Sequence, residues 1–333
     1  MEAFQPQEIE EKIVFESTPF KISTITALGS IGVSVNLQTF FEKMPLNDPS
    51  ELGPVYIEYG RTKSEHSFRG AHHKAKKNLR NAAAARNAAS NGIDTKVKRF
   101  DNQATLDFKM SLDSDYHVNT KMFNNGTVHM TGLKSILDGE KVIAGIIDRL
   151  QQLADADAAV ADRTREGADE SLIVPLDSKM VQGPFSIHLI NSDFKVNFRI
   201  KREVLHEVLV RNYKNKCTYE PCIYPGVKLQ YFYNTATENQ KNNGNCQCPT
   251  GQCAGKGKGA AVGDCKKVTI GVFQSGCVII TGASTVTQIE ECYPYICKVL
   301  KDTIDLIRKR NYIVPGPEVA AAMLEAMGST HRA

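Results

Sequence analysis

Four cysteines in the second half of the chain have the most readily named chemistry. Cys246, Cys248, Cys253 and Cys265 lie in one Gly- and Lys-rich stretch, and cysteine thiolates are common zinc ligands. Their spacing, C-x-C-x₄-C-x₁₁-C, lacks the paired C-x₂-C of well-known zinc sites. We therefore expect a loop with incidental thiols and no cofactor, and we keep a structural zinc site as the alternative.

Catalytic patterns are absent from the sequence. It holds no H-E-x-x-H, no G-x-S-x-G, no kinase set and no paired carboxylates. His72 and His73 are adjacent, but they have no evident carboxylate partner. We expect a protein that is not an enzyme.

The charge is concentrated in one segment, although the formal net charge of the 333 residues is only +4. Residues 61–99 carry eleven Lys and Arg but two acids. The interpretation that we prefer is nonspecific phosphate contact, and the alternative is a solvated loop with a short helix. The residues expected to contact phosphate are Lys74, Lys76, Lys77, Arg80 and Arg86.

No apolar run is long enough to span a membrane, and the first residues do not form a secretory signal. We therefore expect an intracellular protein whose cysteines are reduced.

The sequence F-x-x-G-x-x-x-x-T-G occurs twice, starting at Phe123 and at Phe273. Gly126 and Gly276 stand where a hairpin would turn, a position that favours positive φ. The two copies lie 150 residues apart. They therefore predict two related strand–turn–strand units.

Similar elements surround the two copies. A strand pattern at 20–26 resembles one at 185–191, and the pattern at 52–60 resembles that at 224–233. Helical patterns follow Asn36, a possible N-cap, and cover 201–213. Longer helices are expected from Asp138, as N-cap, to beyond 153 and from 286 to 310. This order predicts an α+β fold of two tandem quasi-repeats that share one antiparallel sheet.

The expected organisation has two repeats, each with an insertion. The first repeat, 18–153, holds the basic insertion at about 61–99. The second repeat, 184–312, holds the Cys-, Gly- and Lys-rich insertion at about 234–265. The remaining segments are an N-terminal tail, a linker and a C-terminal tail, at 1–17, 154–183 and 313–333.

Three stretches of the second half, YEPCIYPGVKLQYFY, KKVTIGVFQSGCVIITGAS and IEECYPYICKVLKD, resemble the second repeat of the TATA-box-binding protein family. KMFNNGTVHMTGLKS resembles the first repeat. The resemblance covers most of 18–153 and 184–310, and the insertions make the chain similar to the diverged TATA-box-binding-like proteins of large DNA viruses. It implies a saddle, with a curved sheet whose concave face binds the minor groove and with long helices on the convex face. In that family, apolar side chains enter between base steps and kink the duplex.

The resemblance also assigns roles to residues of this chain. Phe123 and Phe273 match wedges at the two ends of the DNA site, and Tyr224 matches the second wedge of the second repeat. Similarity of the neighbouring residues assigns the corresponding place in the first repeat to Phe100, whereas repeat spacing assigns it to Leu52. We prefer Phe100. The expected groove-facing residues are Thr131, Thr281, His129 and Ile279.

The centre of the expected DNA site departs from the family pattern. The family places an asparagine on the first strand of each repeat, where our alignment puts Phe20 and Ile187, with Ile22 and Leu189 at the neighbouring apolar places. Because apolar side chains donate no hydrogen bonds, we expect binding that depends on bending and apolar contact.

The resemblance implies a monomeric transcription initiation factor that binds and bends double-stranded promoter DNA. Its expected partners are a B-type initiation factor and the RNA polymerase machinery, with no membrane. The implied place is a host nucleus or a cytoplasmic viral factory, or the virion. The alternative function is a protein-interaction or structural module of the virion that has kept the fold without specific DNA binding.

Overall fold

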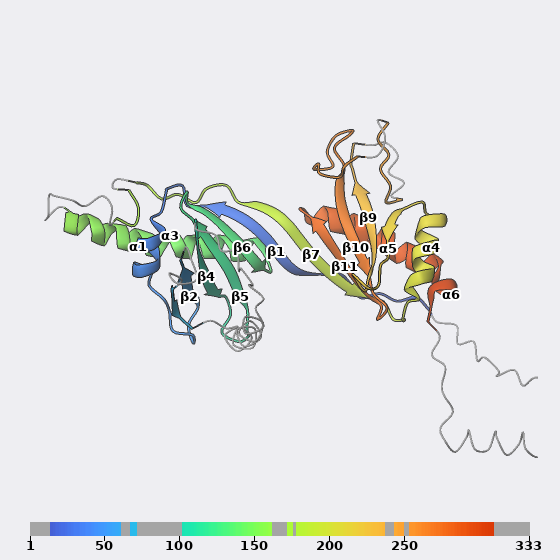
Figure 1. Ribbon diagram of the computed structural model, residues 1–333, viewed down its shortest axis with the longest axis horizontal. Coiled ribbons are helices and arrows are strands. Elements are labelled where there is room, and N and C mark those ends of the chain that lie inside the picture. The colour runs from blue at the N-terminus through green and yellow to red at the C-terminus, as the bar shows by residue number, and fades with distance from the viewer. Residues whose placement is uncertain are drawn as a thin grey trace, which may run out of the picture.

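The computed structural model describes residues 14–60, 67–71, 102–161, 172–175, 178–236, 243–249 and 253–309. They form one antiparallel sheet in the order β3-β2-β4-β5-β6-β1-β7-β11-β10-β9-β8. Figure 1 shows two lobes joined through the long central strands β1 and β7. The predicted α+β fold with two units sharing one sheet is confirmed.

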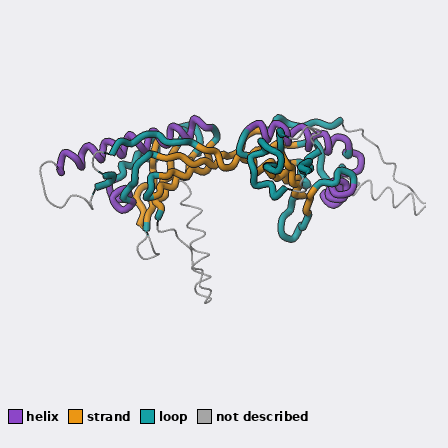
Figure 2. The backbone as a smooth tube through the Cα atoms, turned by 90° about the horizontal axis from the view of Figure 1, so that it is seen from above, coloured by secondary structure: helices purple, strands orange, loops and turns teal. Residues whose placement is uncertain are grey.

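The first lobe holds β1 (Lys21–Ser30), α1 (Leu37–Lys43), β2 (Gly53–Tyr59), β3 (Ser67–Gly70), β4 (Gln103–Lys109), β5 (His117–Phe123), β6 (Thr127–Leu133) and α3 (Ile136–Ala161). The second lobe holds β7 (Ser186–Lys195), α4 (Arg202–Arg211), β8 (Lys216–Thr218), β9 (Val227–Tyr233), β10 (Lys266–Val272), β11 (Cys277–Ala283), α5 (Val286–Asp302) and α6 (Ile304–Ile307). In Figure 2 the long helices run along one side of the strands. No helix among the described residues is long and apolar enough to cross a membrane.

The helix starts follow from local capping. The Asn36 side chain accepts hydrogen bonds from the amides of Gln38 and Thr39, as an N-cap should. Our prediction that Asp138 is the N-cap of α3 is wrong. Ser135 has that place, and the two residues exchange side chain–backbone hydrogen bonds of 3.0 and 3.1 Å, the pattern of a capping box.

The two halves repeat each other in register as well as in order. Ser30 pairs with Thr127, and Lys195 pairs with Cys277. Thr127 and Cys277 are equivalent residues of the two hairpins, 150 positions apart. Their pairing partners Ser30 and Lys195 are therefore equivalent too, so the first strands of the two halves are offset by 165 positions. The β-bulge before Leu133 recurs before Ala283, with Gly132 and Gly282 at φ 94° and 89°. These bulges explain the T-G that ends each repeated motif, since glycine adopts positive φ without strain.

The order of the strands corrects one sequence comparison and one expectation about the basic insertion. By sheet order, β9 corresponds to β4 and β8 corresponds to β2. The strand after Leu52 is therefore not the counterpart of the strand after Tyr224, so the repeat spacing that pointed to Leu52 was misleading. Part of the basic insertion is also not a loop, because β3 lies within it and pairs with β2.

The core lies between the sheet and its helices. Ile25, Ile190, Met130 and Ile280 are almost or fully buried on the helix side of the central strands. The aromatic rings of Phe20 and Tyr293 of α5 are 5.5 Å apart. Because Phe20 precedes β1 and Tyr293 belongs to the other half, this contact ties the two repeats together.

Candidate nucleic-acid interface

The repeated motif forms a pinned turn in each half. The amide of Gly126 donates to the carbonyl of Phe123 at 3.0 Å, and Gly276 and Phe273 make the same bond at 3.0 Å. Gly126 and Gly276 have φ of 77° and 83°, so the predicted turns with positive φ are confirmed. Each Phe therefore stands at the first position of a four-residue β-turn, Phe123–Gly126 in the first half and Phe273–Gly276 in the second.

The chain that leaves each first strand holds these turns in place. Val35 donates its amide to the carbonyl of Asn124 at 2.8 Å, and the equivalent bond joins Ile200 to Gln274 at 2.9 Å. The carbonyls of Gly126 and Gly276 accept from Ile31 and Val196 at 3.0 and 2.9 Å. Backbone hydrogen bonds thus fix both turns in the same way, which preorganises the position of both phenylalanines.

Phe273 stands beside a second aromatic ring. The ring centroids of Tyr224 and Phe273 are 5.6 Å apart, and the Lys228 ammonium lies 4.1 Å from the Tyr224 ring centroid. The Tyr224 hydroxyl lies above Gly271, where an added Cβ would be only 3.2 Å away. Burial raises the pKa of Tyr224, so its hydroxyl stays protonated at neutral pH. The predicted wedge pair of the second half is therefore together in space.

Phe100, the residue that we prefer as the second wedge of the first repeat, lies outside the described residues. Phe100 comes three positions before Gln103, the first residue of β4, and the backbone of Gln103 pairs with that of Phe123. Connectivity therefore favours Phe100 over Leu52 as the counterpart of Tyr224. The five basic residues predicted to contact phosphate also lie outside the described residues: Lys74, Lys76, Lys77, Arg80 and Arg86.

The face of the sheet opposite the long helices, called here the helix-free face, carries most of the predicted groove residues. Thr26 pairs with Thr131 on one side and with Leu189 on the other, so all three share this face. His129 pairs with Leu28, and Ile279 pairs with Asp193. Two residues away from His129 and Ile279, Thr131 and Thr281 face the same way.

The structure corrects the expected centre of this face. Ile22 pairs with the buried Ser192 and packs against the helix-side core, and Ile187 pairs with the buried Ala27. The prediction that Ile22 lines the groove is therefore wrong. Bulges in the β1–β7 pairing, near Ser23 and His188, turn these residues to the other face.

Polar side chains occupy the centre instead. Thr24 pairs with Asn191 and Thr26 pairs with Leu189, which places two hydroxyls and one amide on the helix-free face. The expectation of a centre without hydrogen-bond donors was wrong, because our alignment shifted the first strands by two residues. Placing Phe20 against Ile187 is an offset of 167 positions, whereas the register relates the first strands by 165 positions.

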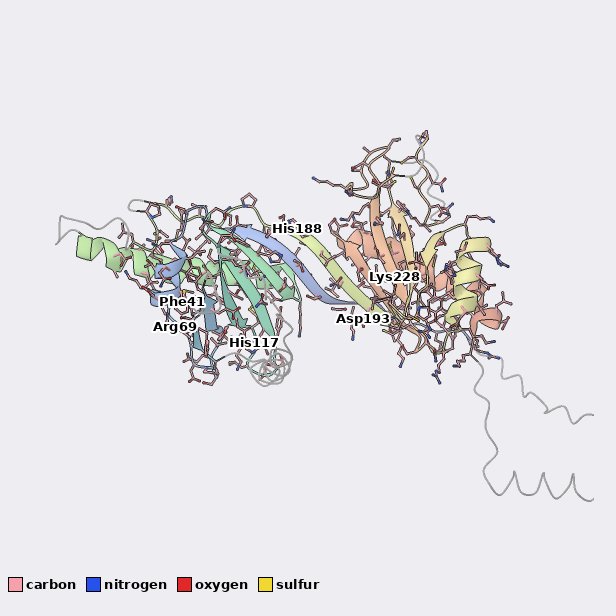
Figure 3. The ribbon with its side chains drawn as sticks, viewed as in Figure 1. Phe41, Arg69, His117, His188, Asp193 and Lys228 are labelled. Atoms are coloured by element: carbon pink, nitrogen blue, oxygen red, sulfur yellow. The ribbon has the colours of Figure 1, made fainter. Side chains whose placement is uncertain are left out.

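Charge on the helix-free face differs between the lobes. The only acid that the register places there among the described strands of the second lobe is Asp193, 3.5 Å from the Lys21 ammonium. Figure 3 labels Asp193 on β7 and Lys228 on β9. The same register turns four lysines of the second lobe to this face: Lys195, Lys216, Lys228 and Lys267.

The outer strands of the first lobe are less suited to DNA. Asp107 shares the helix-free face with Asn119, is 1% exposed, and has its carboxylate 3.3 Å from His117. Tyr56 pairs with Asp107 and is also buried. The half-exposed part of the face therefore consists of β1, β5, β6 and the second lobe.

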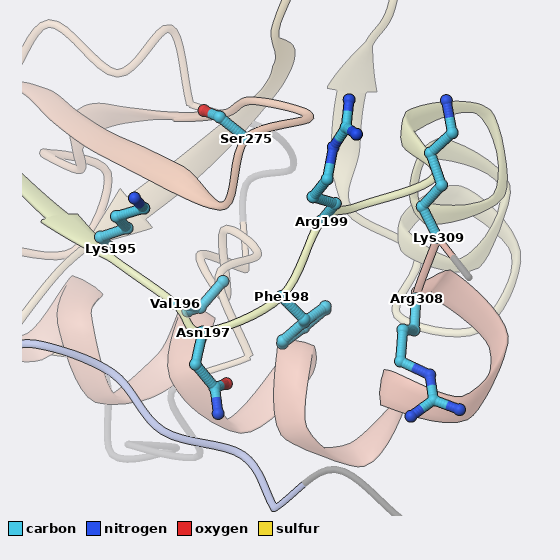
Figure 4. Close-up of a pocket in the computed structure, with 8 residues that line it drawn as sticks. All are labelled: Lys195, Val196, Asn197, Phe198, Arg199, Ser275, Arg308 and Lys309. Carbon is cyan, nitrogen blue, oxygen red and sulfur yellow. The ribbon is translucent and has the colours of Figure 1, made fainter. Parts of the chain in front are cut away.

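A pocket of about 330 Å³ lies beside the turn that carries Phe273, and its lining residues are drawn in Figure 4. Its lining includes Ser275 of that turn and the cations Lys195, Arg199, Arg308 and Lys309, without an acid. A cluster of cations without acids attracts anions such as phosphate. The equivalent positions of the first lobe hold Ser30 and Ser34 in place of Lys195 and Arg199.

His129 is a titratable residue on the helix-free face. Burial lowers its pKa, and Lys121 and His188 lower it further. The imidazole is therefore neutral at pH 7 and donates a hydrogen bond from one nitrogen only.

Comparison with known proteins adds an independent finding. No family model matches the chain. Among solved structures, Methanococcus jannaschii TBP aligns with a TM-score of 0.42 and 16% identity, covering 86% of this chain and 99% of that one. A TATA-box-binding protein-like protein of Acanthamoeba polyphaga mimivirus is 25% identical over 304 residues, which are 90% of this chain and 70% of that protein. The resemblance read from the sequence is therefore confirmed: this chain is similar, over most of its length, to a viral TATA-box-binding-like protein.

Proposed function

We propose that this protein binds double-stranded DNA in the minor groove through the helix-free face and bends it, acting as a transcription initiation factor. The observation that carries the proposal is the pair of identically pinned turns, which hold Phe123 and Phe273 at equivalent places of a two-fold sheet. An apolar side chain held rigidly at a groove edge can enter an unstacked base step, which kinks the duplex.

Both halves of the proposed interface come from one chain, so a monomer suffices to contact both ends of a site. Recruitment of a B-type initiation factor and of RNA polymerase would then fall to the helix side. The similarity to a TATA-box-binding protein-like viral protein supports this role.

The direct test uses a duplex of about 20 base pairs with central TA steps and a donor and acceptor dye on its ends. TA steps kink easily, so binding with bending brings the dyes closer and raises energy transfer. Absence of both binding and bending in the purified full chain would overturn the proposal.

The second candidate function is a protein-interaction module. Burial of Tyr56 and Asp107 on the helix-free face favours it, because buried side chains cannot contact a duplex. A chain that fails to bind duplexes but keeps its fold would support this candidate.

The cation-lined pocket leads to a prediction about salt. The double variant Arg199→Gln/Lys309→Gln is expected to reduce the slope of log K against log salt by about 0.9 for each phosphate that the protein no longer neutralises. Anisotropy titrations measure this slope at salt concentrations from about 50 to about 200 mM, the range over which DNA affinity falls steeply. Lys298→Gln is the control, because Lys298 lies on α5 in an ion pair with Asp302. Equal slopes for the double variant and the wild type would show that the pocket does not contact phosphate.

The central amide leads to a prediction about specificity. Asn191 can donate to the acceptors of A·T pairs and can accept from the amino group of guanine. We expect Asn191→Leu to change the ratio of affinities for duplexes with central A·T and central G·C pairs by roughly 5- to 150-fold, the usual cost of a mismatched pair. Asn212→Ala, at the C-cap of α4, is the control. An unchanged ratio would exclude Asn191 from base readout.

His129 leads to a prediction about pH. DNA phosphates favour the protonated imidazole, so affinity should increase as pH falls from about 7.5 to 5.5, with uptake of up to about one proton. His129→Gln is expected to flatten this dependence, whereas His206→Gln on α4 should preserve it. In the free protein the sign is opposite: because the folded pKa is lowered, the free energy of unfolding decreases as pH falls below about 6.5. Identical pH profiles for wild type and His129→Gln would contradict a groove position for His129.

A further inference from the structure

The insertion between β9 and β10 brings four cysteines together. The Sγ atoms of Cys246, Cys248, Cys253 and Cys265 all lie within 4.8 Å of one another. We propose that these residues bind one structural Zn²⁺ ion, and that this ion folds the insertion against the sheet.

The sulfur–sulfur distances fit a single tetrahedral ion. The Sγ atoms of Cys248 and Cys265 are 3.5 Å apart, and those of Cys265 and Cys246 are 3.7 Å apart. Zinc–sulfur bonds of about 2.3 Å at tetrahedral angles separate the sulfurs by about 3.8 Å. A disulfide would need about 2.05 Å. The four cysteines form no disulfide, and Cys248 and Cys265 are buried.

Hydrogen-bond donors point at the sulfurs. The amide of Gly263 lies 3.1 Å from Cys248 Sγ, and the amide of Cys253 lies 3.4 Å from Cys246 Sγ. Asn234 Nδ2 lies 3.4 Å from Cys265 Sγ. Donors directed at sulfur stabilise thiolates and orient them, as outer partners do in metal sites. Four protein ligands leave no open position, so the site is structural and not catalytic.

The insertion has no apolar core of its own. Residues 234–265 contain no Leu, Ile, Met or aromatic residue, and their single valine, Val262, is 56% exposed. Among the described residues of this part of the chain, Phe232 of β9 packs with the four cysteines in a small apolar cluster. A segment that buries so little apolar surface cannot offset its loss of conformational entropy, whereas a metal ion supplies the missing free energy.

The folded insertion places a lysine-containing loop at the end of the sheet. Gly259 lies against Tyr233, and the amide of Thr235 donates to the Gly259 carbonyl at 2.8 Å. The amide of Lys267 donates to the Gly255 carbonyl at 2.9 Å, and Gln288 of α5 donates to the Lys258 carbonyl at 3.4 Å. The ion would therefore hold residues 253–265 against β9, β10 and α5.

The test is the metal content of the full chain, purified under reducing conditions without chelator. Elemental analysis is expected to find about one zinc per chain. Replacement by Co²⁺ should give the intense absorption of tetrahedral cobalt bound to thiolates. Removal of the metal should open residues 234–265 to protease while the rest of the sheet stays protected.

Variants separate the cluster from the other cysteines. Cys248→Ser/Cys265→Ser should lose the zinc and the cobalt spectrum, and the control Cys222→Ser/Cys277→Ser should retain both. Because the cobalt spectrum is recorded on the wild type, the proposal is testable even if the cluster variant does not fold. Wild-type protein with four reduced thiols but neither zinc nor a cobalt spectrum would overturn it. Disulfides among these four cysteines, detected by mass spectrometry, would overturn it too.

Discussion

The double variant Phe123→Ala/Phe273→Ala is expected to lose the DNA bend and most of its affinity for duplexes. Both rings stand at the first position of a turn fixed by backbone hydrogen bonds, so wild type presents them without an ordering cost. Stacking between an aromatic side chain and a base contributes about 1–3 kcal/mol by alanine substitution, which corresponds to roughly 5- to 150-fold for each ring. Energy transfer between dyes on the duplex ends measures the bend, and anisotropy measures the affinity.

The control is Phe68→Ala. Phe68 is 66% exposed and belongs to the edge strand β3, away from either turn. Phe68→Ala is expected to keep the bend and the affinity within a factor of about two of the wild-type values, as surface substitutions usually do. Full bending by the double variant would refute the wedge mechanism, while duplex binding itself would still be judged from the wild type.

Gly276→Ala and Gly126→Ala are expected to be the most destabilising small substitutions in the two turns. An added Cβ would lie 2.5 Å from the Phe198 carbonyl oxygen at Gly276, and 2.0 Å from the Val33 carbonyl oxygen at Gly126. The left-handed backbone conformation adds about 1–2 kcal/mol for any residue with a Cβ. We expect the free energy of unfolding to fall by about 2–4 kcal/mol, the range of substitutions that strain the backbone and overlap atoms. Urea unfolding followed by circular dichroism measures it.

Gly263→Ala separates the two causes. Gly263 has φ of 85°, close to that of Gly276, but an added Cβ there meets no atom within 4 Å. It should therefore show only the conformational contribution. If all three substitutions lower the free energy of unfolding equally, close contact with the carbonyls does not contribute to the destabilisation. The turns would then be held less tightly than the hydrogen bonds indicate.

Local pattern predicted the turns because their chemistry is short-range. Gly126 and Gly276 were assigned positive φ from the spacing of the motif, and both adopt it. Asn36 was assigned as a cap and caps α1. The capping of α3 was assigned to the wrong residue, because Ser135 and Asp138 bond to each other and either can be read as the first residue of the pair.

The pairing of distant strands could not be predicted in the same way. A shift of two residues keeps the alternation of apolar and polar side chains, so the alignment that paired Ile22 with Leu189 was consistent with the pattern. The bulges between β1 and β7 then turned Ile22 and Ile187 toward the core, whereas Thr24 and Asn191 alternate regularly with Ile25 and Ile190 and lie on the helix-free face. The correspondence of β4 with β9 also depended on sheet order.

The sequence by itself determined that this protein has two related halves, where each half turns, and which aromatic residues stand at the turns. Those features depend on backbone conformation and side-chain type within ten residues. The tertiary structure alone decided which side chains share the helix-free face, and that cysteines up to nineteen positions apart have sulfurs within 4.8 Å. Irregular spacing along the chain is no obstacle to a metal site, because a folded insertion brings ligands together through its path in space.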